Sequence, residues 1–188
     1  MTTPQYNLNY KYGADLREIP EDAASMQAYV DFLLTELKKL TAEQPRLSVK
    51  FLGEIGSYAR MLGKTEAAHQ ALDKSLSLID QHEMGLPLWG VHSLRYGEVM
   101  RAKKDDLAAE TAFHSVLEMS RRHPEICELE DFALQHLGKL RFSQKKFKEA
   151  ETFFREALEL RKKKAVPELI QSTELALRVL LMTKDRLK

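Results

Sequence analysis

The sequence predicts an all-α fold, an α-α superhelix (solenoid) in which helical hairpins repeat along the chain. The segment Ala109–Met119, AETAFHSVLEM, nearly recurs 41 residues later as AETFFREALEL in Ala150–Leu160. Glycine recurs at the same interval, at Gly56, Gly97 and Gly138. The composition also favours helices, because the 188 residues include only 8 glycines and 6 prolines. We therefore expect three copies of one helical unit.

Each copy carries an apolar face with the spacing of an α-helix. Alanine stands at Ala68, Ala109 and Ala150, with large apolar residues four positions later at Leu72, Phe113 and Phe154, and leucine four later again at Leu76, Leu117 and Leu158. Residues four apart lie on the same side of a helix. We expect two amphipathic helices per copy, crossing closely at the small residues while the larger ones fill the space beside them.

These signals divide the chain into a tail and one domain. We expect an extended or disordered N-terminal tail at residues 1–19 and a domain at 20–188. The domain would hold a capping helix (20–43), three repeats (45–83, 86–123 and 124–164) and a C-terminal capping helix (166–187). First helices are expected at about 47–62, 87–103 and 125–142, and second helices at 65–82, 106–122 and 146–163. Pro45, Pro87, Pro124 and Pro167 precede or open successive first helices, where the missing N–H is tolerated. Eight helices are expected.

The repeat resembles the tetratricopeptide repeat family, whose signature has Leu-Gly in the first helix and Ala-x3-Phe in the second. Leu137-Gly138, Ala150 and Phe154 match it best. The signature Trp is replaced by Leu52, Ser93 and Leu134, its Tyr by Ala59, Met100 and Arg141, and its late Pro is missing. The period of 41 exceeds the family's 34 by about two helical turns, which lengthens the helices without rotating their apolar face. The resemblance, to a long-repeat variant, covers residues 45–164.

Composition and motifs narrow the class of function. Lys plus Arg is 29 and Asp plus Glu is 28, so no net field favours nucleic acid or a membrane as a partner. Cys127 is the single cysteine, and neither a signal peptide nor a spanning segment is visible, so we expect a cytoplasmic protein. Phosphate loops, nucleophile elbows and metal-binding helices are missing from the sequence. We expect no enzyme activity, no cofactor and no metal site.

The resemblance implies a protein-interaction module, an adaptor or scaffold, with a groove lined by the first helices. Mapped onto this chain, the expected groove residues are Lys50, Ser57, Arg60, Val91, Leu94, Arg101, Phe132, Gln135 and Lys139. This face is mixed and slightly basic, so we expect a protein or peptide partner with acidic side chains and a few apolar anchors. A chaperone C-terminal tail is disfavoured, because both asparagines, Asn7 and Asn9, lie outside the repeats.

The last helix carries a second apolar stripe, Leu175, Val179 and Met182, nearly opposite the face that packs on the preceding repeat. An exposed apolar stripe on a terminal helix predicts that another segment or subunit packs on it. One alternative is a second subunit, which would make the protein a self-associating homodimer; another is the tail, where apolar residues alternate from Tyr6 to Tyr12. A basic edge formed by Arg121–His123 and Arg161–Lys164 leaves nucleic-acid binding as a third, less favoured function.

Overall fold

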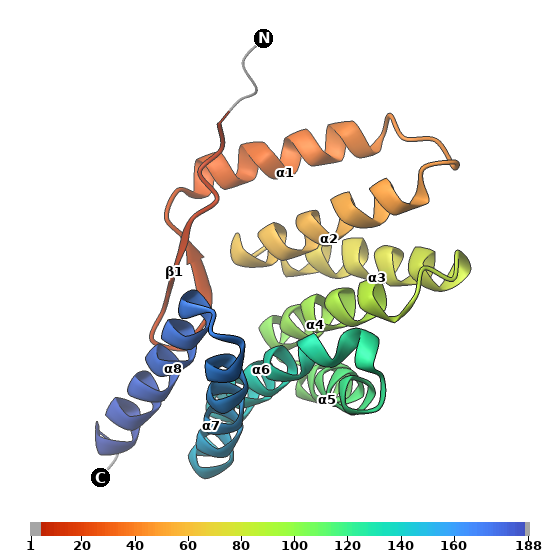
Figure 1. Cartoon of the computed structure of the whole chain (residues 1–188). Helices are drawn as coiled ribbons and strands as arrows, with labels where there is room; N and C mark the ends of the chain where they lie inside the picture. The colour runs from red at the N-terminus through yellow and green to blue at the C-terminus, as the bar shows by residue number, and fades with distance from the viewer. Residues whose placement is uncertain (1–4, 187–188) are drawn as a thin grey trace.

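The computed structural model describes residues 5–186, in which eight α-helices, one 3-10 helix and two short strands follow one another along the chain (Figure 1). The bounds are β1 (Tyr10–Tyr12), β2 (Glu18–Pro20), α1 (Ala23–Leu37), α2 (Pro45–Met61), α3 (Thr65–Gln81), α4 (Leu86–Lys103), α5 (Asp106–Arg122), η1 (Pro124–Leu129), α6 (Glu130–Ser143), α7 (Phe147–Lys164) and α8 (Pro167–Arg186). The two ends of the predicted domain organisation, residues 1–4 and 187–188, lie outside the described range.

Consecutive helices pack as antiparallel hairpins, and the hairpins stack into a curved array from α1 to α8 (Figure 1). The predicted all-α repeat fold and the count of eight helices are thus confirmed for the described residues. One helix differs from expectation. The first helix of the third repeat is divided into η1 and α6, and the tighter winding of η1 buries Ile126 while its glutamates stay exposed.

The three repeated glycines lie where the two helices of each hairpin cross, as predicted. A β-carbon built on Gly56 would lie 2.4 Å from the side chain of Leu72, and one on Gly97 would lie 2.4 Å from the ring of Phe113. The third copy has the same arrangement, because a β-carbon on Gly138 would lie 2.5 Å from the Phe154 ring. The repeat period therefore reflects one packing contact made three times.

The tail forms an antiparallel ribbon, in which Lys11 pairs with Ile19 and Tyr12 with Glu18. We call residues 9–21 the N-terminal hairpin; Glu21 N donates to Asn9 O at its base, 3.0 Å away. It descends from the start of α1 to α8 (Figure 1). The sequence indicated an extended or disordered tail and gave no sign of this strand pairing.

Candidate protein-binding groove

The first helices of the repeats and η1 border an open cavity of about 310 Å³. It is lined by Ser57, Arg60, Val91, Leu94, Arg95, Glu98, Leu129, Phe132 and His136. Five of these residues, Ser57, Arg60, Val91, Leu94 and Phe132, belong to the nine that the sequence analysis placed in the groove. The cavity therefore lies on the inner face formed by α2, α4 and α6.

Helical spacing brings the lining residues to one side of each helix. Val91, Arg95 and Glu98 are separated by four and three positions on α4, and Phe132 and His136 by four positions on α6. Residues three and four apart are neighbours on a helix surface. The opposite side of each first helix packs on its second helix, so these side chains point inward.

One wall of the cavity is apolar. Val91, Leu94, Leu129 and Phe132 form it, and Leu94 is only 6% exposed. Arg161 and Lys164 lie over the Phe132 ring, 5.3 and 5.6 Å from its centroid, which holds the ring in place. A wall of this kind can bury an apolar side chain of a bound segment.

Arg95 is the cation of this cavity that the sequence analysis missed. Within residues 5–186 its guanidinium has neither a hydrogen bond nor an ion pair. Burial lowers its pKa, and the charge of Glu54 partly offsets that effect, so the group is a partly desolvated, unpaired cation. Its position four residues after Val91 was the available signal. A carboxylate of a partner would find an unused ion-pairing group here.

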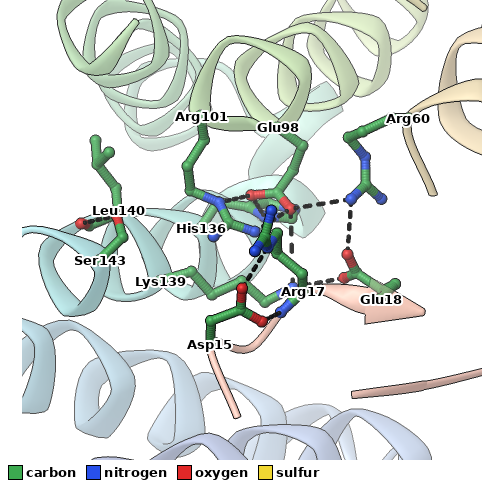
Figure 2. A network of polar contacts seen from close by, with 10 residues as sticks. All are labelled: Asp15, Arg17, Glu18, Arg60, Glu98, Arg101, His136, Lys139, Leu140 and Ser143. Carbon is green, nitrogen blue, oxygen red and sulfur yellow. Dashed lines mark hydrogen bonds and ion pairs between the residues drawn. The ribbon is translucent and has the colours of Figure 1, made fainter. Parts of the chain in front are cut away.

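The floor of the groove is a buried network of ion pairs centred on Glu98 (Figure 2). The Glu98 carboxylate accepts hydrogen bonds from Arg101 Nε at 2.9 Å and Nη2 at 3.0 Å. His136 Nδ1 lies 3.1 Å from Glu98 Oε1, and Lys139 Nζ lies 4.0 Å from Oε2. Glu98 thus ties α4 to α6.

A second carboxylate enters this network from the N-terminal hairpin. Glu18 Oε1 accepts a hydrogen bond from Lys139 Nζ at 2.6 Å, and Glu18 Oε2 accepts one from Arg60 Nη1 at 2.9 Å (Figure 2). All three side chains are at least nine-tenths buried. Glu18 therefore joins α2 to α6 across the groove.

Burial and the neighbouring charges together decide which groups of this network are ionised. Burial opposes ionisation of Glu98, but the positive charges of Arg101 and Lys139 outweigh it and hold the pKa of that carboxyl well below its usual value. Burial also opposes ionisation of Glu18, yet Lys139 and Arg60 lower its pKa to about 2. Burial lowers the pKa of His136 despite the adjacent Glu98, so the imidazole is neutral at pH 7.

The remaining predicted groove residues lie outside the cavity lining. Arg101 and Lys139, expected to offer charge to a partner, are buried and already paired with Glu98 and Glu18. Gln135 is 4% exposed, and Lys50 is exposed on α2 away from the cavity. The chain itself supplies the acidic groups that these cations were expected to recruit.

The outward stripe of α8 is partly covered. Val179 packs against the apolar cluster that contains Leu16 of the hairpin, and Leu175 is half-buried. Met182 remains 53% exposed, next to Leu181 at 44%. Leu16 belongs to that cluster, whereas the tail segment that the sequence offered as a cover was Tyr6 to Tyr12.

The ends of the second helices do not form the continuous basic edge considered above. Arg161 is buried and donates from Nε to Asp131 Oδ2 at 2.7 Å and from Nη1 to Thr173 Oγ1 at 2.7 Å. Lys164 Nζ also reaches Asp131, at 2.5 Å. The sequence could not show that one carboxylate, 30 residues before Arg161, pairs with both of these cations.

Residues 5–186 contain no group of three His, Cys, Asp or Glu side chains able to hold a metal ion, and no helix among them is long and apolar enough to span a membrane.

Comparisons with known proteins match a family model and solved structures. The family model described as tetratricopeptide repeat matches residues 133–168, which include most of α6, all of α7 and the start of α8. The crystal structure of BtubC (BKLC) from P. vanneervenii is similar, with a TM-score of 0.68 over 92% of this chain and 70% of that chain at 15% identity. None of the curated proteins matches. At that identity the structural likeness concerns the fold alone.

Proposed function

We propose that this chain, whose residues 133–168 match the tetratricopeptide repeat family model, binds a peptide segment of a partner protein in its groove. The family generally binds proteins or peptides and is generally non-catalytic, which supports an interaction module. The expected role is that of an adaptor or scaffold.

One observation carries the proposal: an apolar cavity beside an unpaired, partly buried arginine. The cavity opens on the inner face between α2, α4 and α6, where Leu94 and Phe132 provide apolar surface and Arg95 provides charge. Its volume of about 310 Å³ is at the small end of the usual range for ligand pockets, so it suits one or two side chains of a longer segment. An Asp or Glu next to an aliphatic or aromatic residue fits both features.

The alternative functions receive less support. A stable dimer buries roughly 800 Å² per partner, whereas the exposed apolar residues of α8 in the described range are Leu181 and Met182. Nucleic-acid binding through the second-helix ends has fewer free cations than the sequence indicated, because Asp131 already engages Arg161 and Lys164.

Selection of binders from a random peptide library on the full chain tests the proposal. We expect selected peptides to pair an acidic residue with an apolar one, and Arg95→Glu to weaken them at least about tenfold, the loss of about 1.4 kcal/mol of binding free energy. Lys50→Glu is the matched control, because it makes the same charge change on the exposed part of α2, and it should leave affinity within about twofold. Equal effects of the two variants, or no selected peptide, would refute the groove assignment.

A further inference from the structure

We propose that the inner face contains a recognition site for a Leu-x-Glu segment. The chain's own N-terminal hairpin fills this site as a tethered ligand, and a partner segment of the same chemistry can take its place. This inference rests on the proposed function and deepens it by naming the partner's chemistry and its competitor. We call this the Leu-x-Glu site; it consists of an apolar part that holds Leu16 and a charged part that holds Glu18.

The apolar part of the site surrounds the hairpin's turn. Leu16 is 1% exposed and packs in one cluster with Phe142, Phe154 and Leu180, from α6, α7 and α8. Its backbone has φ +59°, a left-handed conformation that is uncommon for leucine. Such a conformation persists only where its surroundings stabilise it, and here the buried side chain does so. Burial of Leu16 therefore helps to hold the turn in this shape.

The charged part of the site lies two residues further along the hairpin. Glu18 is held by Lys139 and Arg60, as described above, and Lys139 Nζ also lies 5.1 Å from the centroid of the Tyr12 ring. These partners come from α6, α2 and the opposite strand of the ribbon. Leucine and glutamate thus contact two separate subsites at a fixed spacing.

The charge of the site requires an anion from the hairpin or from a replacement. The repeats contribute three cations, Arg60, Arg101 and Lys139, but only one carboxylate in the network, Glu98. His136 is neutral at pH 7, and Asp15 and Arg17 of the turn neutralise each other. Without Glu18, three positive charges would face one negative charge in a buried setting, which is costly. The repeats alone therefore form an anion-binding site.

The hairpin is suited to exchange because its own structure is small: beyond the short strands, its turn has two backbone hydrogen bonds, Leu16 N to Gly13 O at 3.0 Å and Gly13 N to Arg17 O at 2.9 Å. Its strands have three residues each, and an isolated two-stranded ribbon is marginally stable in water. Arg60 also lines the open cavity. A partner segment that enters the cavity and continues toward Lys139 would meet Glu18 and compete with it.

Binding in trans tests the proposal on the 188-residue chain. The probe is a fluorescein-labelled synthetic peptide of residues 6–21, and the receptor is a Leu16→Ser, Glu18→Gln double variant whose own hairpin has lost both anchors. We expect the peptide to bind this variant at least about tenfold more tightly than the wild type, measured by fluorescence anisotropy. A peptide that carries the same two substitutions should bind neither protein. Lys11→Gln is the control receptor, exposed on β1, and should behave as the wild type.

The following outcomes would overturn the proposal. Two of them are binding results: equal affinity of the peptide for the wild type and the double variant, or equal binding of the altered peptide. A third is a double variant that no longer folds, which would make the hairpin an integral part of the core. A wild-type dimer in light scattering that the double substitution abolishes would place the hairpin in a second copy and also overturn it. Because Arg95 is untouched, failure here leaves the Arg95→Glu result to test the proposed function separately.

Discussion

Replacing Gly97 by alanine should destabilise the protein, although alanine is the better helix former. Gly97 lies within α4, and the added β-carbon would come within 2.4 Å of one Phe113 ring carbon and 2.8 Å of two others. The ring cannot retreat readily, because Phe113 is fully buried and is stacked on His136 with centroids 5.2 Å apart. The helix or the ring must therefore shift.

The magnitude follows from two opposing terms. Overpacking a well-filled core costs about 1–3 kcal/mol, and a contact this short with a confined ring belongs in the upper half of that range. Alanine in place of glycine recovers about 1 kcal/mol of helix propensity. We expect a net loss of about 1–2 kcal/mol in the free energy of unfolding.

Gly90→Ala is the matched control, because Gly90 lies on the same helix. Its β-carbon would meet only the side chain of Leu129, whose terminal methyl, 2.5 Å away, can rotate aside. This variant should be neutral or more stable by up to about 1 kcal/mol. In a Phe113→Ala background, Gly97→Ala should likewise cease to destabilise, because the obstructing ring is gone.

Urea unfolding followed by far-ultraviolet circular dichroism measures these differences through the midpoint and slope of each transition. If Gly97→Ala and Gly90→Ala proved equally stable, the close crossing of the two helices would not be the contact that the repeat preserves. The same reasoning applies to the other two repeated glycines.

Three other predictions concern the buried charges, a buried histidine and the last helix. Asp131→Ala should lower the free energy of unfolding by about 3–5 kcal/mol, because it leaves Arg161 buried and without its carboxylate partner. Glu118→Ala, which breaks the exposed pair with Arg122, should change that free energy by less than about 1 kcal/mol. Similar values for the two variants in urea unfolding would contradict this. Burial lowers the pKa of His92 to about 4, so the unfolded chain takes up this proton first as the pH falls, and stability declines from about pH 6.5 to about pH 4. About 2 kcal/mol should be lost between pH 7 and pH 5, and His92→Asn should remove that part of the slope; an unchanged slope would show that other groups cause it. The wild type and Met182→Glu should show the same monomeric mass by light scattering, and a dimer that the substitution abolishes would restore the self-association alternative.

The repeat architecture could be predicted because its signals are periodic and local. Glycine, alanine and a bulky residue recur every 41 positions, and each triplet specifies a contact between helices joined by a short turn. The inner face could be mapped for the same reason, since helical spacing decides which side of a first helix is free. These features can be predicted because they depend on residues that are close together in the sequence.

The pairing of the groove's charges could not be predicted, because it joins residues far apart in the chain. Glu18 and Lys139 are 121 positions apart, and neither the strand pairing nor the hairpin's place in the groove follows from a local pattern. Lys139 and Arg101 consequently look like free cations in the sequence, and Arg95, which is free of such partners in residues 5–186, does not stand out. Which charges remain available is decided by tertiary contacts.

The crystal structure of the full chain with its tightest selected peptide tests the central claim most directly. We predict a peptide carboxylate within about 4 Å of the Arg95 guanidinium and the neighbouring apolar side chain between Leu94 and Phe132. A peptide bound on the outer face of the second helices, or along α8, would contradict the account.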